Sequence, residues 1–144
     1  MLVTTKGRYA LIALCDLAQH QDAGPVPLKE IAERQQLSDK YLESILKALV
    51  RAGYLAGTRG KGGGYRLTVS PEQLSVLDVL EEVETDLGVV EGIDQDETAG
   101  LQAGPQVRLL DMWRELDALV RGYLADKTVA ELASAVDPGD YYVI

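Results

Sequence analysis

Residues 38–69 read SDKYLESILKALVRAGYLAGTRGKGGGYRLTV, and this stretch decides the fold. Ser38 is a good helix N-cap. The apolar residues that follow recur at helical spacing, at Leu42, Ile45, Leu46 and Leu49. Two short strand-like segments come next, residues 54–59 and 65–69, and they flank a tip made of four glycines and Lys61. We therefore predict a helix with one buried face, followed by a β-hairpin with a basic, glycine-rich turn.

Two further helices are predicted before this stretch. Residues 5–20 show helical periodicity, with Thr5 as the expected N-cap. The expected inward positions are Tyr9, Leu11, Ile12, Cys15, Leu17 and Ala18. After a break at residues 22–27, residues 28–34 form a short second helix. Helix, turn, capped helix and basic hairpin, in this order, are typical of a winged helix-turn-helix, whose last helix enters the major groove of DNA.

The chain after the hairpin is predicted to be helical as well. Residues 70–73 suggest a capping box, and Ser75 opens a short helix through Glu84 that closes a DNA-binding domain of residues 1–84. Residues 85–104 contain glycines and acidic residues, and we predict a mobile loop. Residues 105–135 then hold a long helix and a short one, and residues 136–144 form a tail. The fold class is mainly α with a small β-hairpin wing.

The long helix carries more apolar surface than one small domain can cover. The stripe consists of Leu109, Met112, Trp113, Leu116, Val120 and Tyr123. A helix of this kind needs a partner. We predict a homodimer, and two-fold symmetry then predicts a palindromic operator.

The charge is divided unevenly between the two halves of the chain. The net charge of −9 is unusual for a DNA-binding protein, but residues 1–70 carry +4 and residues 71–144 carry −13. The acidic half would be repelled by phosphates, which turns the basic half toward the duplex.

The candidate DNA-binding residues fall into three groups. They are Lys6 and Arg8 on the first helix, Ser38, Asp39, Lys40, Tyr41, Glu43, Ser44 and Lys47 on the third helix, and Arg59, Lys61, Gly62, Gly63 and Tyr65 in the hairpin. We expect the cations to hold phosphates and Glu43 to accept from cytosine N4. Periodicity alone also allows a helical hairpin with a solvated charged face. A nucleotide-binding loop is disfavoured, because Lys61 is followed by glycine rather than by serine or threonine and a helix.

Enzymatic and metal chemistry find little support in the sequence. His20 is the only histidine, has no partner placed by a pattern, and is expected to end the first helix. Cys15 is the only cysteine, and an inert core thiol is expected. The acidic residues of 81–97 lack calcium-loop spacing. We expect no catalytic residue and no metal site. A single cysteine fits the cytoplasm, and no apolar run suggests a membrane.

Several motifs resemble the IscR/NsrR/CymR family of winged-helix regulators. They are residues 5–10 (TKGRYA), 38–43 (SDKYLE), 59–65 (RGKGGGY), 113–116 (WREL) and 128–132 (TVAEL). The resemblance covers nearly the whole chain and implies DNA binding by a dimer built on the long C-terminal helices. The iron-sulfur members of this family place three cysteines in the loop before the long helix, whereas residues 85–104 have none. We therefore expect no cofactor and a closer likeness to the clusterless, CymR-type repressors of cysteine metabolism.

The resemblance also implies a protein partner. Cysteine synthase (O-acetylserine sulfhydrylase) accepts partner proteins whose terminal isoleucine carboxylate enters its active site. Tyr141, Tyr142, Val143 and Ile144 fit such a partner-binding tail. The alternatives are a tail that folds back on its own dimer, a protein-interaction module with weak DNA binding, and a small-molecule-responsive regulator without a link to cysteine metabolism.

Overall fold

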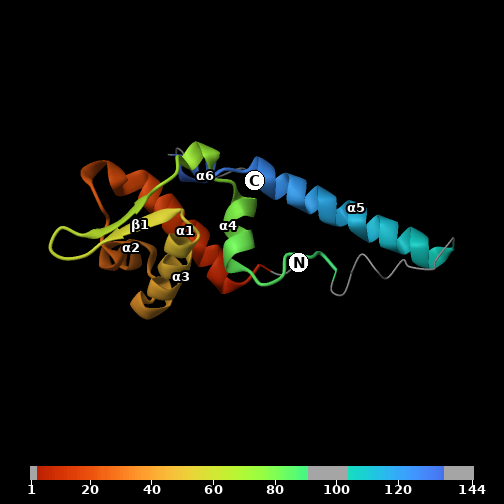
Figure 1. The fold of residues 1–144 in the computed structure, drawn as a ribbon, viewed down its shortest axis with the longest axis horizontal. Coiled ribbons are helices and arrows are strands. Elements are labelled where there is room, and N and C mark those ends of the chain that lie inside the picture. Colours follow the sequence, from red (N-terminus) through yellow and green to blue (C-terminus); the bar gives the residue numbers. More distant parts are fainter. Residues whose placement is uncertain (1–2, 91–103, 135–144) are drawn as a thin grey trace, which may run out of the picture.

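A computed structural model describes residues 3–90 and 104–134, and it shows a helical body from which one long helix projects (Figure 1). The helices are α1 (Thr5–His20), α2 (Leu28–Gln35), α3 (Asp39–Arg51), α4 (Val76–Val83), α5 (Pro105–Asp126) and α6 (Val129–Ala133). Two strands, β1 (Leu55–Thr58) and β2 (Gly64–Leu67), form an antiparallel hairpin. These elements confirm the predicted fold class, a mainly α winged helix with a long helix near the C-terminal end.

Side-chain caps begin α1, α3, α4 and α6, and two of the predicted caps are wrong. The Ser38 side chain accepts from the Tyr41 amide as predicted, and Ser75 forms a capping box with Asp78. The cap of α1 is Thr4 rather than Thr5, because the Thr4 side chain accepts from the Gly7 amide. Residues 70–73 do not form a capping box: the Ser70 hydroxyl accepts from no backbone amide of the following turn and instead donates to the Glu72 carboxylate.

The core surrounds α1, which packs against α3, α4 and α6. The four apolar residues predicted for α3 are all fully buried. On α1 the buried apolar residues are Ala10, Ala13, Leu14 and Leu17. The predicted inward stripe of α1 is therefore partly wrong, since Ile12 is 37% exposed and Cys15 only half-buried. Apolar residues surround most of α1, so periodicity could not identify the face that its neighbours cover.

The hairpin is anchored to the linker that precedes α2. Leu55 pairs with Leu67 and Thr58 with Gly64. Val26 adds a bridge beside β2, since its amide donates to the Tyr65 carbonyl and its carbonyl accepts from the Tyr65 amide, both at 2.8 Å. Gly64 has φ +151°, and a side chain there would overlap the Val26 backbone. The bridge therefore requires glycine at 64 and holds the wing against the body.

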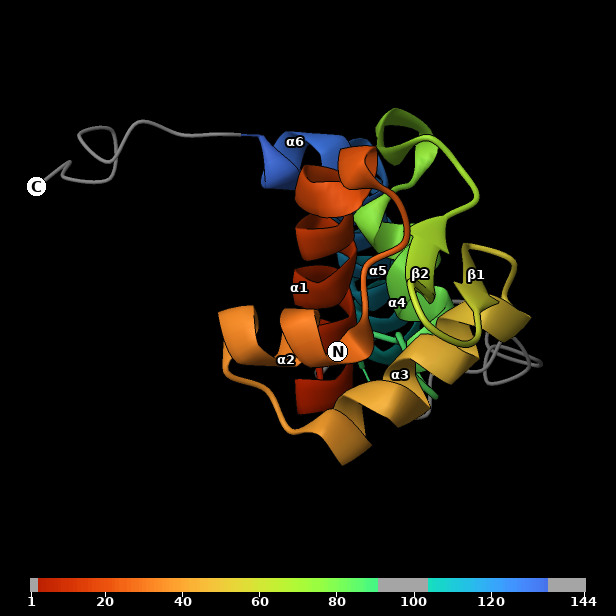
Figure 2. The same cartoon turned by 90° about the vertical axis from the view of Figure 1, so that its left-hand side faces the viewer.

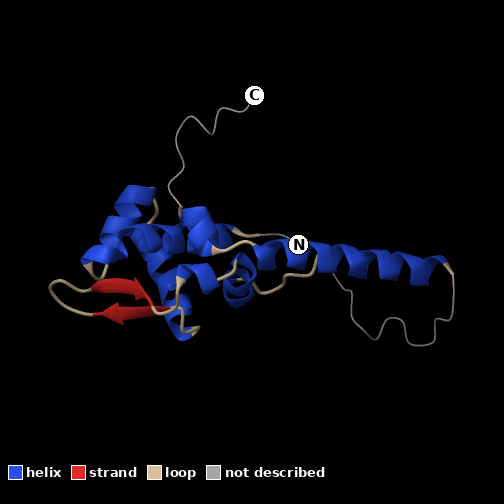
Figure 3. Ribbon diagram, turned by 90° about the horizontal axis from the view of Figure 1, so that it is seen from above, coloured by secondary structure: helices blue, strands red, loops and turns tan. Residues whose placement is uncertain are grey.

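The segment between the C-terminal end of α5 and the start of α6 is bound to the helical body. The Val76 amide donates to the Lys127 carbonyl, and the Val129 amide donates to the Leu74 carbonyl. Val129 is fully buried, so α6 belongs to the same core as α1. Figure 3 shows that α5 has its C-terminal end at this body and projects away from it. No helix among the described residues is long and apolar enough to cross a membrane.

Candidate nucleic-acid interface

The outer face of α3 carries the polar residues predicted to meet DNA. Viewed from the end that bears the hairpin, α2, α3 and the strands lie in front and α5 lies behind (Figure 2). The candidate residues from Ser38 to Lys47 on this face are all exposed. Lys47 Nζ lies 3.0 Å from Glu43 Oε1, and the Ser44 hydroxyl donates to the Tyr41 carbonyl. The face thus combines a cation with groups that can accept from bases.

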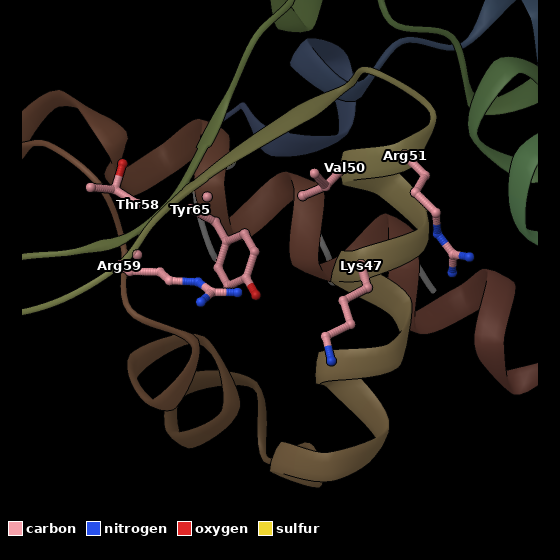
Figure 4. A pocket seen from close by; sticks show the side chains of 8 residues that line it. Lys47, Val50, Arg51, Thr58, Arg59 and Tyr65 are labelled. Atoms are coloured by element: carbon pink, nitrogen blue, oxygen red, sulfur yellow. The ribbon is translucent and has the colours of Figure 1, made fainter.

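A groove separates α3 from the hairpin. It has a volume of about 560 Å³ and is lined by Lys47, Val50, Arg51, Gly57, Thr58, Arg59, Gly64 and Tyr65. Figure 4 shows Arg59 and Tyr65 on one side and Lys47, Val50 and Arg51 on the other. The structure therefore brings three of the predicted residues, Lys47 of α3 and Arg59 and Tyr65 of the hairpin, to one hollow.

Sequence reasoning missed Arg51, although a signal for it was present. Arg51 follows Lys47 by four residues, which places the two cations on one side of α3. Lys61, by contrast, lies exposed in the hairpin turn beyond the lining of the groove. Gly60 and Gly62 have φ +92° and +80° in that turn, and a side chain at Gly63 would overlap the Thr58 carbonyl. The glycines are thus needed to form the turn that carries Lys61.

The start of α1 lies next to the start of α3. The Tyr9 and Tyr41 rings meet edge to face, with centroids 5.6 Å apart. Arg8 is exposed one residue earlier, and its Nη2 donates to Thr5 Oγ1 at 3.2 Å, whereas Lys6 is half-buried. Of the two predicted cations on α1, Arg8 is therefore the better placed to reach a phosphate.

The apolar residues of α5 divide between two faces. Trp113 and Val120 are half-buried. The exposed apolar residues are Leu109, Met112, Leu116, Leu119 and Tyr123. Their spacing of alternately three and four residues is that of a coiled-coil seam. We call these five residues the α5 seam; it contains Leu119, 66% exposed, which sequence reasoning missed.

A buried carboxylate joins α1 to α2, and no local pattern announced it. Asp16 accepts from Nε and Nη2 of Arg34, at 2.9 and 2.8 Å, and from the Gln35 side-chain amide at 2.9 Å. Burial alone would raise the pKa of Asp16, but these hydrogen bonds and the nearby positive charge hold it below its ordinary value. The ionised carboxylate thereby fixes the end of α2, the helix that precedes α3.

The remaining titratable candidates do not form a reactive site. Burial raises the pKa of the Cys15 thiol, which lowers its reactivity. His20 does end α1, with Nδ1 2.8 Å from the Asp16 carbonyl. Within residues 3–90 and 104–134, no three His, Cys, Asp or Glu side chains are grouped to hold a metal ion. The candidate tail residues Tyr141, Tyr142, Val143 and Ile144 lie outside the described residues.

Comparison with known proteins gives a consistent result. The model of the Rrf2 family, described as an iron-dependent transcriptional regulator, matches residues 3–135. The HTH-type transcriptional regulator IscR of Aliivibrio salmonicida is 37% identical over 132 residues, which cover 92% of this chain and 77% of the relative. CymR, the global cysteine regulator of B. subtilis, has a similar structure, with 31% identity, a TM-score of 0.78, and 95% and 99% of the two chains covered. IscR of T. potens is also similar, with 32% identity, a TM-score of 0.72, and coverage of 99% and 97%.

Proposed function

This chain belongs to the Rrf2 family of transcriptional regulators, and on that premise we propose that it acts as a cytoplasmic, homodimeric repressor. In this proposal α3 enters the major groove of a palindromic operator, and the hairpin meets the adjacent minor groove. The relatives carry the names of regulators rather than of enzymes.

The groove between α3 and the hairpin is the observation that carries the DNA-binding geometry. Arg51 and Arg59 approach it from two elements, and neither takes part in an ion pair among the described residues. Unpaired cations on both sides of a hollow suit a phosphate backbone passing between them. Lys47 remains bound to Glu43 in the free protein, so DNA would compete for that lysine.

The homodimer rests on the α5 seam. Five exposed apolar side chains at coiled-coil spacing on a projecting helix favour burial against an identical helix. If the two α5 helices pair, a two-fold axis relates the two copies of α3, and each reads one half of the operator.

Salt dependence tests the proposed interface. We expect operator affinity to fall steeply with salt, because each phosphate that a cation neutralises releases counterions. Arg51→Ala and Arg59→Ala should each lower the magnitude of the salt slope by about one per protomer, or about two per dimer. The measurement is the dissociation constant by fluorescence anisotropy at several salt concentrations, with a duplex selected from a random pool.

Arg114→Ala, which removes a cation from α5, serves as the control and should leave the slope unchanged. A flat salt dependence of the wild-type protein would contradict DNA binding through this groove.

We propose that the protein works without an iron-sulfur cluster, although its family model is described as iron-dependent. Cluster ligation in such proteins relies on several thiolates, and this sequence contains one cysteine. That cysteine, Cys15, is half-buried on α1, and burial keeps its thiol protonated. The donor set therefore does not fit a cluster.

The narrower proposal is that the regulated genes belong to cysteine metabolism and that cysteine synthase is a co-regulator bound through residues 141–144. The similarity to CymR, described as a global cysteine regulator, supports this target class. Deletion of Ile144 is expected to abolish co-elution with cysteine synthase in size-exclusion chromatography, while the operator affinity of the dimer stays unchanged. If wild-type protein and cysteine synthase never co-elute, a regulator without this partner is the better description.

A further inference from the structure

Glu84, directly after α4, contacts the start of α1. One carboxylate oxygen, Oε1, accepts from both the backbone amide and the hydroxyl of Thr4, each at 2.9 Å. The backbone of Glu84 is itself fixed, since its amide donates to the Leu80 carbonyl and ends α4. Figure 1 shows the end of α4 beside the start of α1.

This contact determines how α1 begins. The single hydroxyl proton of Thr4 is committed to Glu84, so Thr4 Oγ1 is left to accept from the Gly7 amide, which caps the helix. The first turn of α1 has no acidic residue of its own, and Glu84 supplies the negative charge that a helix N-terminus favours.

Gly7 indicates that the close approach is specific. A side chain at this buried position would overlap Glu84 Oε1 and press on Leu80. Glycine is unfavourable inside a helix. Its presence here allows α4 and the Glu84 carboxylate to lie against the first turn of α1.

The same turn of α1 contacts the DNA-reading helix. Tyr9 follows Gly7 by two residues, and its ring contacts Tyr41 at the start of α3. Arg8, which stands between Gly7 and Tyr9 in the sequence, is exposed. The first turns of α1 therefore carry both contacts: Thr4 binds Glu84 at the helix start, and Tyr9, on the same helix, meets Tyr41.

We propose that Glu84 is a positioning residue for DNA binding, which holds the first turn of α1 so that Tyr9 supports Tyr41 and Arg8 faces the duplex. This inference rests on the proposed DNA-binding function. The expected change in DNA affinity has the opposite sign to a simple charge effect. Removal of a carboxylate from a DNA-binding domain strengthens its attraction to phosphates, whereas release of the first turn of α1 weakens binding.

The test compares Glu84→Ala, Glu84→Gln and Glu82→Ala by operator affinity, with thermal unfolding to verify folding. Glu84→Ala is expected to weaken binding by about tenfold, a typical effect for a residue that acts through others. Glu84→Gln keeps an acceptor oxygen and should recover most of the affinity. Glu82→Ala removes an equal charge from the exposed side of α4 and should leave affinity unchanged or higher.

Two further variants show whether the effect passes through α1. Thr4→Val removes the hydroxyl that links Glu84 to the helix cap and should reproduce the weaker binding, even if Glu84→Ala fails to fold. In a Tyr41→Ala background, Glu84→Ala should lower operator affinity clearly less than it does in the wild type, because Glu84 is proposed to act through Tyr41. If folded Glu84→Ala or Thr4→Val protein binds as tightly as wild type, the inference is wrong. If wild-type protein prefers no duplex at all, the proposed function itself fails.

Discussion

Leu119→Asp is expected to convert the homodimer into a monomer and to lower operator affinity by about 10²–10⁴-fold, the gain usually provided by linking two binding modules. In one chain Leu119 is 66% exposed, so the substitution leaves the fold of the monomer unaffected. In the proposed dimer the same position lies within the α5 seam, where a carboxylate would be desolvated without a partner. The measurements are the molar mass by light scattering and the operator affinity of the same sample.

Ala118→Asp is a matched control for this substitution. It adds the same charge to α5 one residue away, at an exposed position off the seam. This variant should remain a dimer with nearly unchanged operator affinity. A dimeric Leu119→Asp protein with wild-type affinity would show that α5 pairs through a different face, or that another surface joins the two copies.

The sequence was most informative where one face of a helix alone is buried. Ser38 as cap, four buried positions on α3 and an exposed polar face all followed from residues 38–49, because the polar and apolar residues alternate with one clear helical period. The hairpin was equally readable, since glycines and Lys61 separate two short strand-like segments.

The sequence was least informative where the answer depends on distant neighbours. Apolar residues occur around most of α1, so the position of its buried face depends on where α3, α4 and α6 pack. Two contacts show this. The bridge between Val26 and Tyr65, which anchors the wing, spans 39 positions of the sequence, and the contact between Thr4 and Glu84 spans 80. No local spacing rule covers such pairs.

The α5 seam lies between these cases. Its helical period was visible, but the half-buried Trp113 and Val120 were assigned to the same stripe as the exposed residues. Sequence periodicity shows that α5 is apolar on more than one side, whereas only the packing of α4 and α5 shows which side remains uncovered.

Asp16→Ala is expected to lower the free energy of unfolding by about 3 kcal/mol, because it removes the buried carboxylate that accepts from the side chains of both Arg34 and Gln35. The value lies at the low end for a broken buried pair, since the Arg34 side chain is 32% exposed and water can reach it. Urea denaturation at pH 7 measures the change. Glu30→Ala removes the other carboxylate near Arg34, an exposed partner 3.6 Å away, and should cost less than about 0.5 kcal/mol.

The difference between wild type and Asp16→Ala should also depend on pH. The folded state holds the pKa of Asp16 below its ordinary value, so the unfolded chain takes up this proton first as pH falls. The stabilisation is complete above the ordinary aspartate pKa of about 3.9 and is lost as pH falls through the lower folded value. When both proteins are unfolded with urea at several values between pH 7 and pH 3, the difference in their free energies of unfolding should therefore narrow only at the acid end. A gap that is constant across this range would mean that Asp16 contributes through packing rather than through its charge.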